Sequence, residues 1–309
     1  MELIWRWGLE LIRTVQLVAG PAFDVVFTGI TSLGSEVFFL MLVPCILWCI
    51  DTTLGVRMAV LFLLSAYANA GLKDLFAHPR PFELDPSVQR NEIGGYGLPS
   101  GHSQLAVVVW GTIAAALRKC WAWVVAILLI LLIGLSRIYL GVHFPTDVLA
   151  GWTVGALSLA AYLWLGPEVE SWVRQCGLSV QLGLAVVAPV LLLLVHFTDA
   201  TVLVMAVLLG AGVGAALAQR VAPLDAAGTA LQRVLRFLVG IMGLLLLYLG
   251  LKAIFPSESE PLYIVCRFVR YGLVGLWTSL GAPWLVRKLR LGQAPSACMD
   301  TAGTSTQRR

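Results

Sequence analysis

Residues 120–141 read CWAWVVAILLILLIGLSRIYLG, and Arg137 is the only charged residue among them. An α-helix rises about 1.5 Å per residue, so roughly 20 residues of this kind cross the ~30 Å hydrocarbon core of a bilayer. The whole chain shares this character: 59% of its 309 residues are hydrophobic, 12% are charged, and its mean hydropathy is +0.87. A soluble domain is about one quarter charged. The sequence therefore indicates an integral membrane protein.

Apolar runs of similar length recur along the chain, and we expect an all-α fold with about nine transmembrane helices. The runs lie at 35–50, 55–76, 101–117, 120–141, 147–166, 180–198, 200–219, 234–255 and 262–285. We expect four parts: an N-terminal interfacial helical segment at 1–34, a core of about five spans at 35–166, an additional bundle of about four spans at 167–290, and a disordered cytoplasmic tail at 291–309.

The distribution of Lys and Arg predicts the orientation, because short cytoplasmic loops are enriched in both. One topology places the tail on the same side of the membrane as the connections at 51–54, 118–119, 167–179 and 220–233. In this topology, 12 of the 21 basic residues lie in or beside the segments on that side. We expect these ends and the C-terminus to be cytoplasmic. Short connections and the lack of a convincing cleavable signal favour a bacterial inner membrane, with the opposite ends facing the periplasm.

Composition also argues against several kinds of site. The net charge of +4 is small, and we expect no nucleic-acid partner. The six cysteines are scattered without the spacing of a zinc site or a disulfide framework, and five of them lie in or beside apolar runs. We expect them to be packing residues.

Three segments, 73–81, 99–102 and 136–147, concentrate polar residues in a chain that otherwise avoids them. All three fall at the same ends of predicted spans, where ionisable residues are functional candidates because burying them unpartnered is costly. In the first segment, the prolines around Arg80 prevent the helix from continuing. The resulting bend allows Arg80 to fold back toward Lys73, so that both cations contact one phosphate.

The second segment, Pro99-Ser100-Gly101-His102, opens the third predicted span. Ser100 is a favourable helix N-cap, and the backbone N–H groups that follow it are unpaired and suited to bind phosphate. Gly101 allows an anion to approach the backbone closely. His102 lies on the first turn, where it could protonate a leaving oxygen.

The third segment places Arg137 near the end of the fourth span, then His143, then Asp147 four residues further on. Pro145 is well suited to a first helical turn. Asp147 could accept the Nδ1–H of His143, which would leave Nε2 free to attack phosphorus and would stabilise the imidazolium that forms.

These segments resemble the three-part signature of the type 2 phosphatidic acid phosphatase superfamily, a family of membrane lipid phosphate phosphatases. The matching residues are Lys73-x6-Arg80-Pro81, Pro99-Ser100-Gly101-His102 and Ser136-Arg137-x5-His143-x3-Asp147. The resemblance covers roughly residues 20–166 in order, spacing and placement, and no signature position is missing.

The resemblance implies a metal-independent hydrolase that forms a phosphohistidine and needs no cofactor. His143 would be the nucleophile, Asp147 its orienting carboxylate and His102 the general acid. The phosphate oxygens would be held by Lys73, Arg80, Ser100, Gly101 and Arg137.

The alcohol behind the phosphate stays open. A site at the outer interface suits a lipid phosphate or diphosphate, and the candidates are a polyprenyl diphosphate, phosphatidic acid, phosphatidylglycerol phosphate and a sphingoid-base phosphate. One alternative is hydrolysis of a small soluble phosphate ester such as a sugar phosphate. Another is a lipid transporter or scramblase with a vestigial histidine site.

Two features outside the signature have open interpretations. The loop at 82–98, with its Gly94-Gly95-Tyr96-Gly97 run, is either a lid or headgroup selector or a flexible connection. The basic residues Lys252, Arg267 and Arg270 either contact a second anionic lipid or reach the headgroups and pair with Glu258 or Glu260. For His78 we expect a position on the loop surface.

Overall fold

The computed structural model describes residues 2–223, 226–257 and 259–291, which form helices and connections and contain no strand. The first helices are α1 (Glu2–Ala19), η1 (Pro21–Phe23), α2 (Asp24–Ser32), α3 (Glu36–Cys49), α4 (Thr52–Phe76), α5 (Pro81–Leu84), η2 (Pro86–Val88), α6 (Gly101–Leu117), α7 (Cys120–Tyr139) and α8 (Pro145–Gln175). Then come α9 (Leu178–Val195), α10 (Asp199–Val221), α11 (Ala230–Ile254), α12 (Tyr263–Leu276), the π-helical turn η3 (Trp277–Gly281) and α13 (Ala282–Lys288). The all-α prediction is confirmed. The tail predicted at 291–309 lies outside the described residues from residue 292 onward.

The predicted number of nine spans is not confirmed. Among the described residues, six helices are long and apolar enough to cross a membrane: α4 with its continuation to Leu84, α7, α8, α9, α10 and α11. Helices α3 and α6 are shorter, with 14 and 17 residues. The ninth predicted run is divided by the π-helical turn η3. A seventh span results if α1 and the helix after its 91° bend are one broken span.

Helix α8 is longer than its apolar run. It has 31 residues and continues beyond residue 166 to Gln175, through Pro167. The charged extension is held by Arg57 of α4, whose Nη2 donates to Glu170 Oε2 at 2.7 Å. The predicted boundary at 166 therefore lies inside a continuous helix, and the division into four parts stays a prediction.

Side-chain caps explain where several helices begin. Asp51 accepts a hydrogen bond from the Leu54 backbone N–H at 2.9 Å and caps α4. Ser100 caps α6, as predicted, and Pro145 occupies the first turn of α8, as predicted. Each cap satisfies a backbone N–H that has no partner within its own helix.

Helices α6 and α8 cross at close range because α8 carries two glycines on one face. A Cβ atom on Gly151 would lie 2.6 Å from the Ser100 carbonyl oxygen, and one on Gly155 would lie 2.6 Å from the Gln104 carbonyl oxygen. Small residues permit this approach between membrane helices. The contact holds the start of α6 beside the start of α8, where the polar segments lie.

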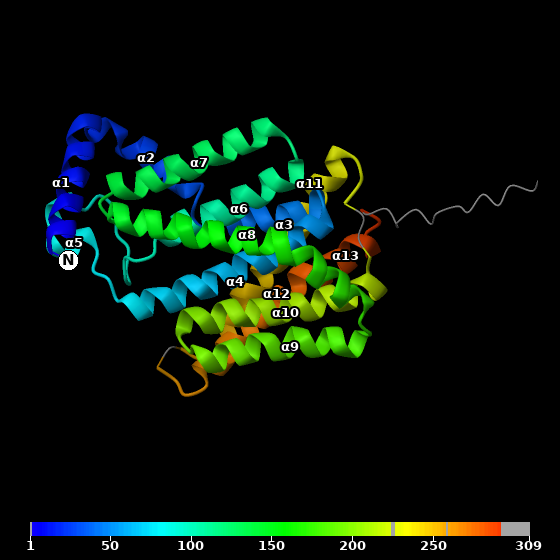
Figure 1. Cartoon of the computed structure of the whole chain (residues 1–309). Coiled ribbons are helices and arrows are strands. Elements are labelled where there is room, and N and C mark those ends of the chain that lie inside the picture. Colours follow the sequence, from blue (N-terminus) through cyan, green and yellow to red (C-terminus); the bar gives the residue numbers. More distant parts are fainter. Residues whose placement is uncertain (1, 224–225, 258, 292–309) are drawn as a thin grey trace, which may run out of the picture.

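Helix α1 runs across the end of the helical bundle at which α7 ends and α8 begins (Figure 1). Its Ile12 packs with Val88 and Phe144 in a buried apolar cluster. The amide of Gln16 donates to the carbonyl oxygens of Val88 and Tyr139, at 2.8 Å in each case. Contacts from residues distant in sequence thus fix α1 against the connection between α7 and α8, while its location at a membrane interface stays a prediction.

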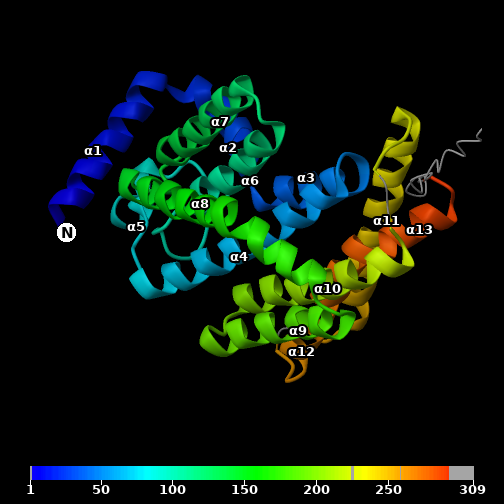
Figure 2. The same ribbon diagram turned by 45° about the vertical axis from the view of Figure 1, so that its right-hand side comes forward.

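Helices α9 and α10 lie beside α4, and α11 packs against α3, so the C-terminal helices do not surround the polar segments (Figure 2). The Tyr67 hydroxyl of α4 donates to the Leu192 carbonyl oxygen of α9 at 2.7 Å. His196 Nε2, in the turn between α9 and α10, lies 2.9 Å from Asp74 Oδ2. This turn is consequently at the same end of the molecule as Lys73.

Candidate active site

All eight predicted site residues lie at one end of the bundle. Helices α4 and α7 finish at this end, while α6 and α8 start there (Figure 1). The three segments therefore meet although they are separated in sequence, and they supply Lys73, Arg80, Ser100, Gly101, His102, Arg137, His143 and Asp147.

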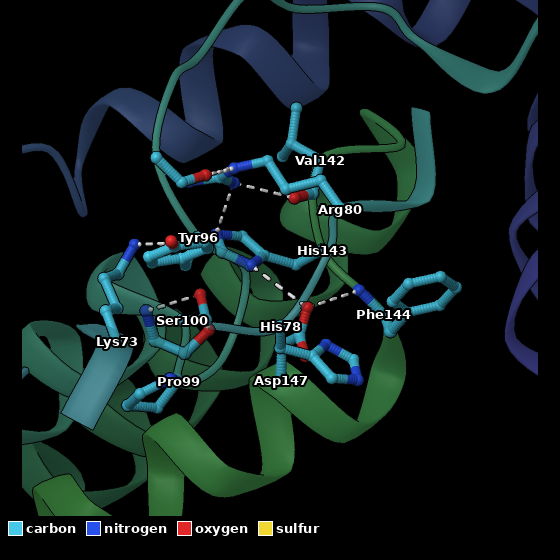
Figure 3. Close-up of polar contacts among 12 residues, drawn as sticks. Lys73, His78, Arg80, Tyr96, Pro99, Ser100, Val142, His143, Phe144 and Asp147 are labelled. Carbon is cyan, nitrogen blue, oxygen red and sulfur yellow. Dashed lines mark hydrogen bonds and ion pairs between the residues drawn. The ribbon is translucent and has the colours of Figure 1, made fainter. Parts of the chain in front are cut away.

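His143 lies in the connection between α7 and α8 and is only 1% exposed. Its Nδ1 is 3.4 Å from Asp147 Oδ2, and its Nε2 is 3.3 Å from Arg80 Nη1. Figure 3 shows the carboxylate and the guanidinium at opposite edges of the imidazole ring. Asp147 thus orients Nδ1 of the ring, while Nε2 faces the guanidinium group of Arg80, a side chain suited to bind phosphate.

Asp147 is fully buried and is held by more than the histidine. Its Oδ2 accepts a hydrogen bond from the Phe144 backbone N–H at 2.9 Å. Its Oδ1 lies 3.3 Å from His78 Nδ1. This distance is short enough for an ion pair, but the two atoms are not aligned for a hydrogen bond. His78 Nε2 in turn accepts the indole N–H of Trp5 from α1 at 2.8 Å. The expectation that His78 lies on the loop surface was wrong: its side chain is 11% exposed and faces the site.

The ring of His143 is neutral at physiological pH. Burial, and then the positive charges of Arg137 and Arg80, lower the pKa of His143 to about 3, against the opposing effect of Asp147. A neutral imidazole has the free electron pair that an attacking nitrogen needs.

Backbone carbonyls of the loop before α6, and one from the connection between α7 and α8, hold the first two basic side chains. Arg80 donates to the carbonyl oxygens of Gly95 at 2.6 Å, Gly94 at 2.9 Å and Val142 at 2.9 Å. Lys73 Nζ donates to the Tyr96 carbonyl oxygen at 2.8 Å (Figure 3). An ammonium has three donor hydrogens and a guanidinium has five. Both side chains therefore keep N–H groups for a further acceptor while the loop covers them.

Of the three basic residues at the site, Arg137 has the most donors without a partner among the described residues. It is 1% exposed, and its Nη1 donates to the Thr31 hydroxyl of α2 at 2.8 Å. Its Nε and Nη2 are buried without a hydrogen-bond partner among the described residues. An unpaired buried donor costs free energy, and an unpaired charge costs more. Three cations beside the single carboxylate of Asp147 create an excess of positive charge that an anion would neutralise.

The start of α6 completes the site. Ser100 is fully buried, and its hydroxyl accepts from the Ser103 hydroxyl at 3.0 Å. A Cβ on Gly101 would lie 3.2 Å from Asn69 Oδ1, so the backbone is packed closely against α4 at this point. His102 is within electrostatic range of Arg137, His143, Lys73 and Arg80. The imidazole of the second segment therefore lies among the charges of the other two.

The described residues contain no group of three or more His, Cys, Asp or Glu side chains arranged to hold a metal ion. The positive groups that face the candidate nucleophile are the guanidinium and ammonium groups described above. These can bind phosphate oxygens directly.

A helical membrane protein with a buried cluster of basic side chains around a neutral histidine has the features of a membrane-embedded phosphatase. Residues 54–170 match the PAP2 superfamily, and residues 202–294 match the PAP2 superfamily phosphatase, transmembrane extension. The chain belongs to the PAP2 superfamily and is an integral membrane protein of the phosphatase type.

Similar proteins of known activity are lipid phosphate phosphatases. Phosphatidylglycerophosphatase B of Bacillus subtilis is 34% identical over 158 residues, which are 47% of this chain and 76% of that protein. Human sphingosine-1-phosphate phosphatase 2 is 33% identical over 41% of this chain and 33% of its own length. The undecaprenyl-diphosphatase of Sulfolobus acidocaldarius is 31% identical over 33% of this chain and 50% of its own length.

Two solved structures are also similar. The transmembrane PAP2 type phosphatidylglycerolphosphate phosphatase from Bacillus subtilis has a TM-score of 0.49 and 27% identity, covering 55% of this chain and 89% of that one. Aquifex aeolicus LpxE has a TM-score of 0.45 and 28% identity, covering 50% and 93%. The chain spans three quarters of the Bacillus relative in sequence but half or less of the human and Sulfolobus relatives.

Proposed function

We propose that this protein hydrolyses a lipid phosphate or diphosphate through a phosphohistidine formed on His143. The observation that carries the proposal is the position of His143: its Nδ1 lies 3.4 Å from a buried carboxylate, and its Nε2 lies 3.3 Å from a guanidinium nitrogen. Relatives of the same family bear the names of phosphatases for phosphatidylglycerophosphate, sphingosine-1-phosphate and undecaprenyl diphosphate.

In the first half of the reaction, Nε2 of His143 attacks phosphorus, and the bond from phosphorus to the leaving oxygen breaks. Asp147 keeps the proton of the ring on Nδ1 and stabilises the imidazolium. His102, protonated while the phosphate anion is bound, gives this proton to the leaving oxygen and becomes neutral, so an alcohol, or a phosphate monoester from a diphosphate, departs. The N–H groups of Lys73, Arg80 and Arg137 bind the nonbridging oxygens, over which negative charge is spread in the transition state.

In the second half, a water molecule attacks the phosphohistidine. The neutral His102 takes a proton from that water, the bond between Nε2 and phosphorus breaks, and inorganic phosphate is released. Ser100 and the backbone N–H groups that begin α6 assist by holding oxygens at a helix N-terminus. Both histidines return to their initial protonation states, and the chemistry needs no cofactor.

The proposed location is a bacterial inner membrane, with the site facing the periplasm and the C-terminus in the cytoplasm. Support comes from the basic residues at the opposite end, where Cys120 is exposed at the start of α7. A chain whose only cysteine is Cys120 should react with a membrane-impermeant maleimide in inverted membrane vesicles. A cysteine-free chain that carries Glu92→Cys should instead react in intact cells and not in inverted vesicles. Reaction of Cys120 and of the cysteine at position 92 from the same side would exclude this topology.

A phosphate-release screen in detergent tests the activity and separates the alternatives. We expect release from one or more lipid phosphates, with and without EDTA, and little release from glucose 6-phosphate. Preference for the sugar phosphate would favour the soluble-ester function. His143→Ala should abolish release, whereas unchanged release by this variant would favour a vestigial histidine site and a transporter or scramblase.

A further inference from the structure

Two arginines of the C-terminal bundle take no part in the proposed reaction. Arg267 and Arg270 are three residues apart on α12 and therefore neighbours on its surface. Arg270 is 8% exposed, and the Arg267 side chain is 16% exposed. At about 1.5 Å per residue, Arg270 lies roughly 10 Å from the start of α12. A charge buried this far along a helix of a membrane protein is a candidate functional residue.

Aromatic rings surround both guanidinium groups. The central carbon of Arg270 lies 5.3 Å from the ring centroid of Tyr248, on α11, and 5.1 Å from that of Tyr271. The central carbon of Arg267 lies 5.7 Å from the Tyr263 ring, and its Nη1 donates to the Tyr263 hydroxyl at 2.9 Å. The rings stabilise the cations over their faces but leave N–H donors at the guanidinium edges.

Carboxylates do not balance these two charges within the described residues. The nearest ion pair, between Arg267 Nη1 and Asp199 Oδ2, is long at 3.8 Å, and the Asp199 side chain is 68% exposed. Glu260 accepts from the Ser257 backbone N–H instead, and Glu258 lies outside the described residues. The Nε atoms of both arginines are buried without a hydrogen-bond partner in the part of the chain that the structure describes.

The cluster lies at the same end of the molecule as the active site but on a different bundle. The connection between α11 and α12 is at the end that holds the turn between α9 and α10 (Figures 1 and 2). Through His196 and Asp74 that turn contacts the residue next to Lys73. Exposed apolar residues flank the cluster, with Leu249 57% exposed on α11 and Val269 43% exposed on α12. This surface is suited to face lipid.

We propose that Arg267 and Arg270, with the hydroxyl groups of Tyr248 and Tyr271, bind the phosphate of an anionic membrane lipid at a site separate from the active site. Guanidinium groups bind phosphate oxygens through paired N–H donors. Basic pockets between membrane helices bind lipid headgroups, and tyrosines are enriched at the depth of the headgroups. The lipid phosphate supplies negative charge beyond the long ion pair with Asp199, which is the only carboxylate contact of the two arginines among the described residues.

Lipid binding to the full chain, delipidated in a neutral detergent, tests this proposal. Phosphatidylglycerol and phosphatidylcholine are added separately, and bound lipid is counted by native mass spectrometry. We expect preferential binding of phosphatidylglycerol, weakened about ten-fold by Arg267→Gln or Arg270→Gln because each removes charge-assisted hydrogen bonds. Lys252→Gln is the matched control, since it removes a cation at the same end of α11 and should change the affinity less than about two-fold.

Inorganic phosphate forms the second arm of the experiment. If phosphate alone raises the melting temperature of the wild type more than that of Arg270→Gln, while phosphatidylglycerol does not, the site binds free phosphate and the lipid assignment is wrong. Equal binding of phosphatidylglycerol by the wild type and both arginine variants would also overturn the proposal. If Arg270→Gln does not fold, Arg267→Gln decides. No measurement uses turnover, so the result is independent of the proposed phosphatase activity.

Discussion

The indole N–H of Trp5 donates to Nε2 of His78 at 2.8 Å, and this bond connects the first helix of the chain to the carboxylate beside His143. An indole N–H is only a donor. A neutral His78 must therefore accept at Nε2 and carry its proton on Nδ1, which lies 3.3 Å from Asp147 Oδ1. Helix α1, outside the matched residues 54–170, thus supports the orientation of the candidate catalytic pair.

Trp5→Phe should lower kcat roughly five-fold, because one hydrogen bond is worth about 1 kcal/mol and its loss frees His78 to turn away from Asp147. Trp7→Phe is the matched control, since Trp7 is 50% exposed on the same helix. Both variants should melt at nearly the same temperature. Equal kcat values for the two variants would show that the contact with His78 has no role in the reaction.

Arg137→Gln should reduce kcat/KM by about a hundred-fold or more, as expected for removal of a donor that stabilises transition-state charge. The same change should leave the melting temperature in detergent unchanged or raise it, because it removes a buried cation with two nitrogens that lack a partner among the described residues. Arg57 lies near the start of α4, at the end of the bundle opposite the site, and pairs with Glu170. Arg57→Gln should therefore show the opposite pattern, with activity retained and some stability lost. Arg137 would be a structural residue if its variant lost stability and kept its activity.

His143 should remain unprotonated in mildly acidic solution, because burial lowers its pKa to about 3. Ring nitrogen shifts in ¹⁵N-histidine-labelled protein, assigned with His143→Asn, should show no titration of this residue between pH 7 and pH 5. The unfolded chain binds a proton at this histidine below about pH 6.5 whereas the folded chain does not, so this residue makes stability fall as the pH drops from 6.5 toward 3. A titration midpoint near 6.5 would mean that the ring is not buried as described.

Gly151→Ala should weaken both folding and activity, because its Cβ would lie 2.6 Å from the Ser100 carbonyl oxygen and 3.1 Å from Ser103 Cβ. The overlap would move the start of α6 away from α8, at a cost of about 1–3 kcal/mol. Gly183→Ala in α9 is the control, since no atom lies within 4 Å of its Cβ and alanine favours a helix. Thermal unfolding and phosphate release of the two variants in detergent would compare them, and equal values would contradict the close crossing.

The sequence predicted the features that depend on local pattern. Apolar runs located the helices, and the spacing within each polar segment located residues such as Ser100 and Pro145, because caps and first turns are local. Helix lengths were less accurate, since α8 continues past its apolar run when Glu170 pairs with Arg57 of another helix. His78 was misplaced for the same reason: its partner Trp5 lies 73 residues away, and no periodicity reports such a contact.

Trapping the covalent intermediate tests the central claim most directly. The protein is mixed with a ³²P-labelled lipid phosphate from which it releases phosphate, quenched within milliseconds in alkali, where a phosphohistidine is stable, and examined for label on the chain. We predict that the wild type carries label that is lost in acid, and that His143→Ala carries none. With a substrate whose leaving group needs no proton, His102→Ala should carry more label than the wild type. Label on His143→Ala equal to that on the wild type, or full turnover by the wild type without any labelled protein, would contradict the account.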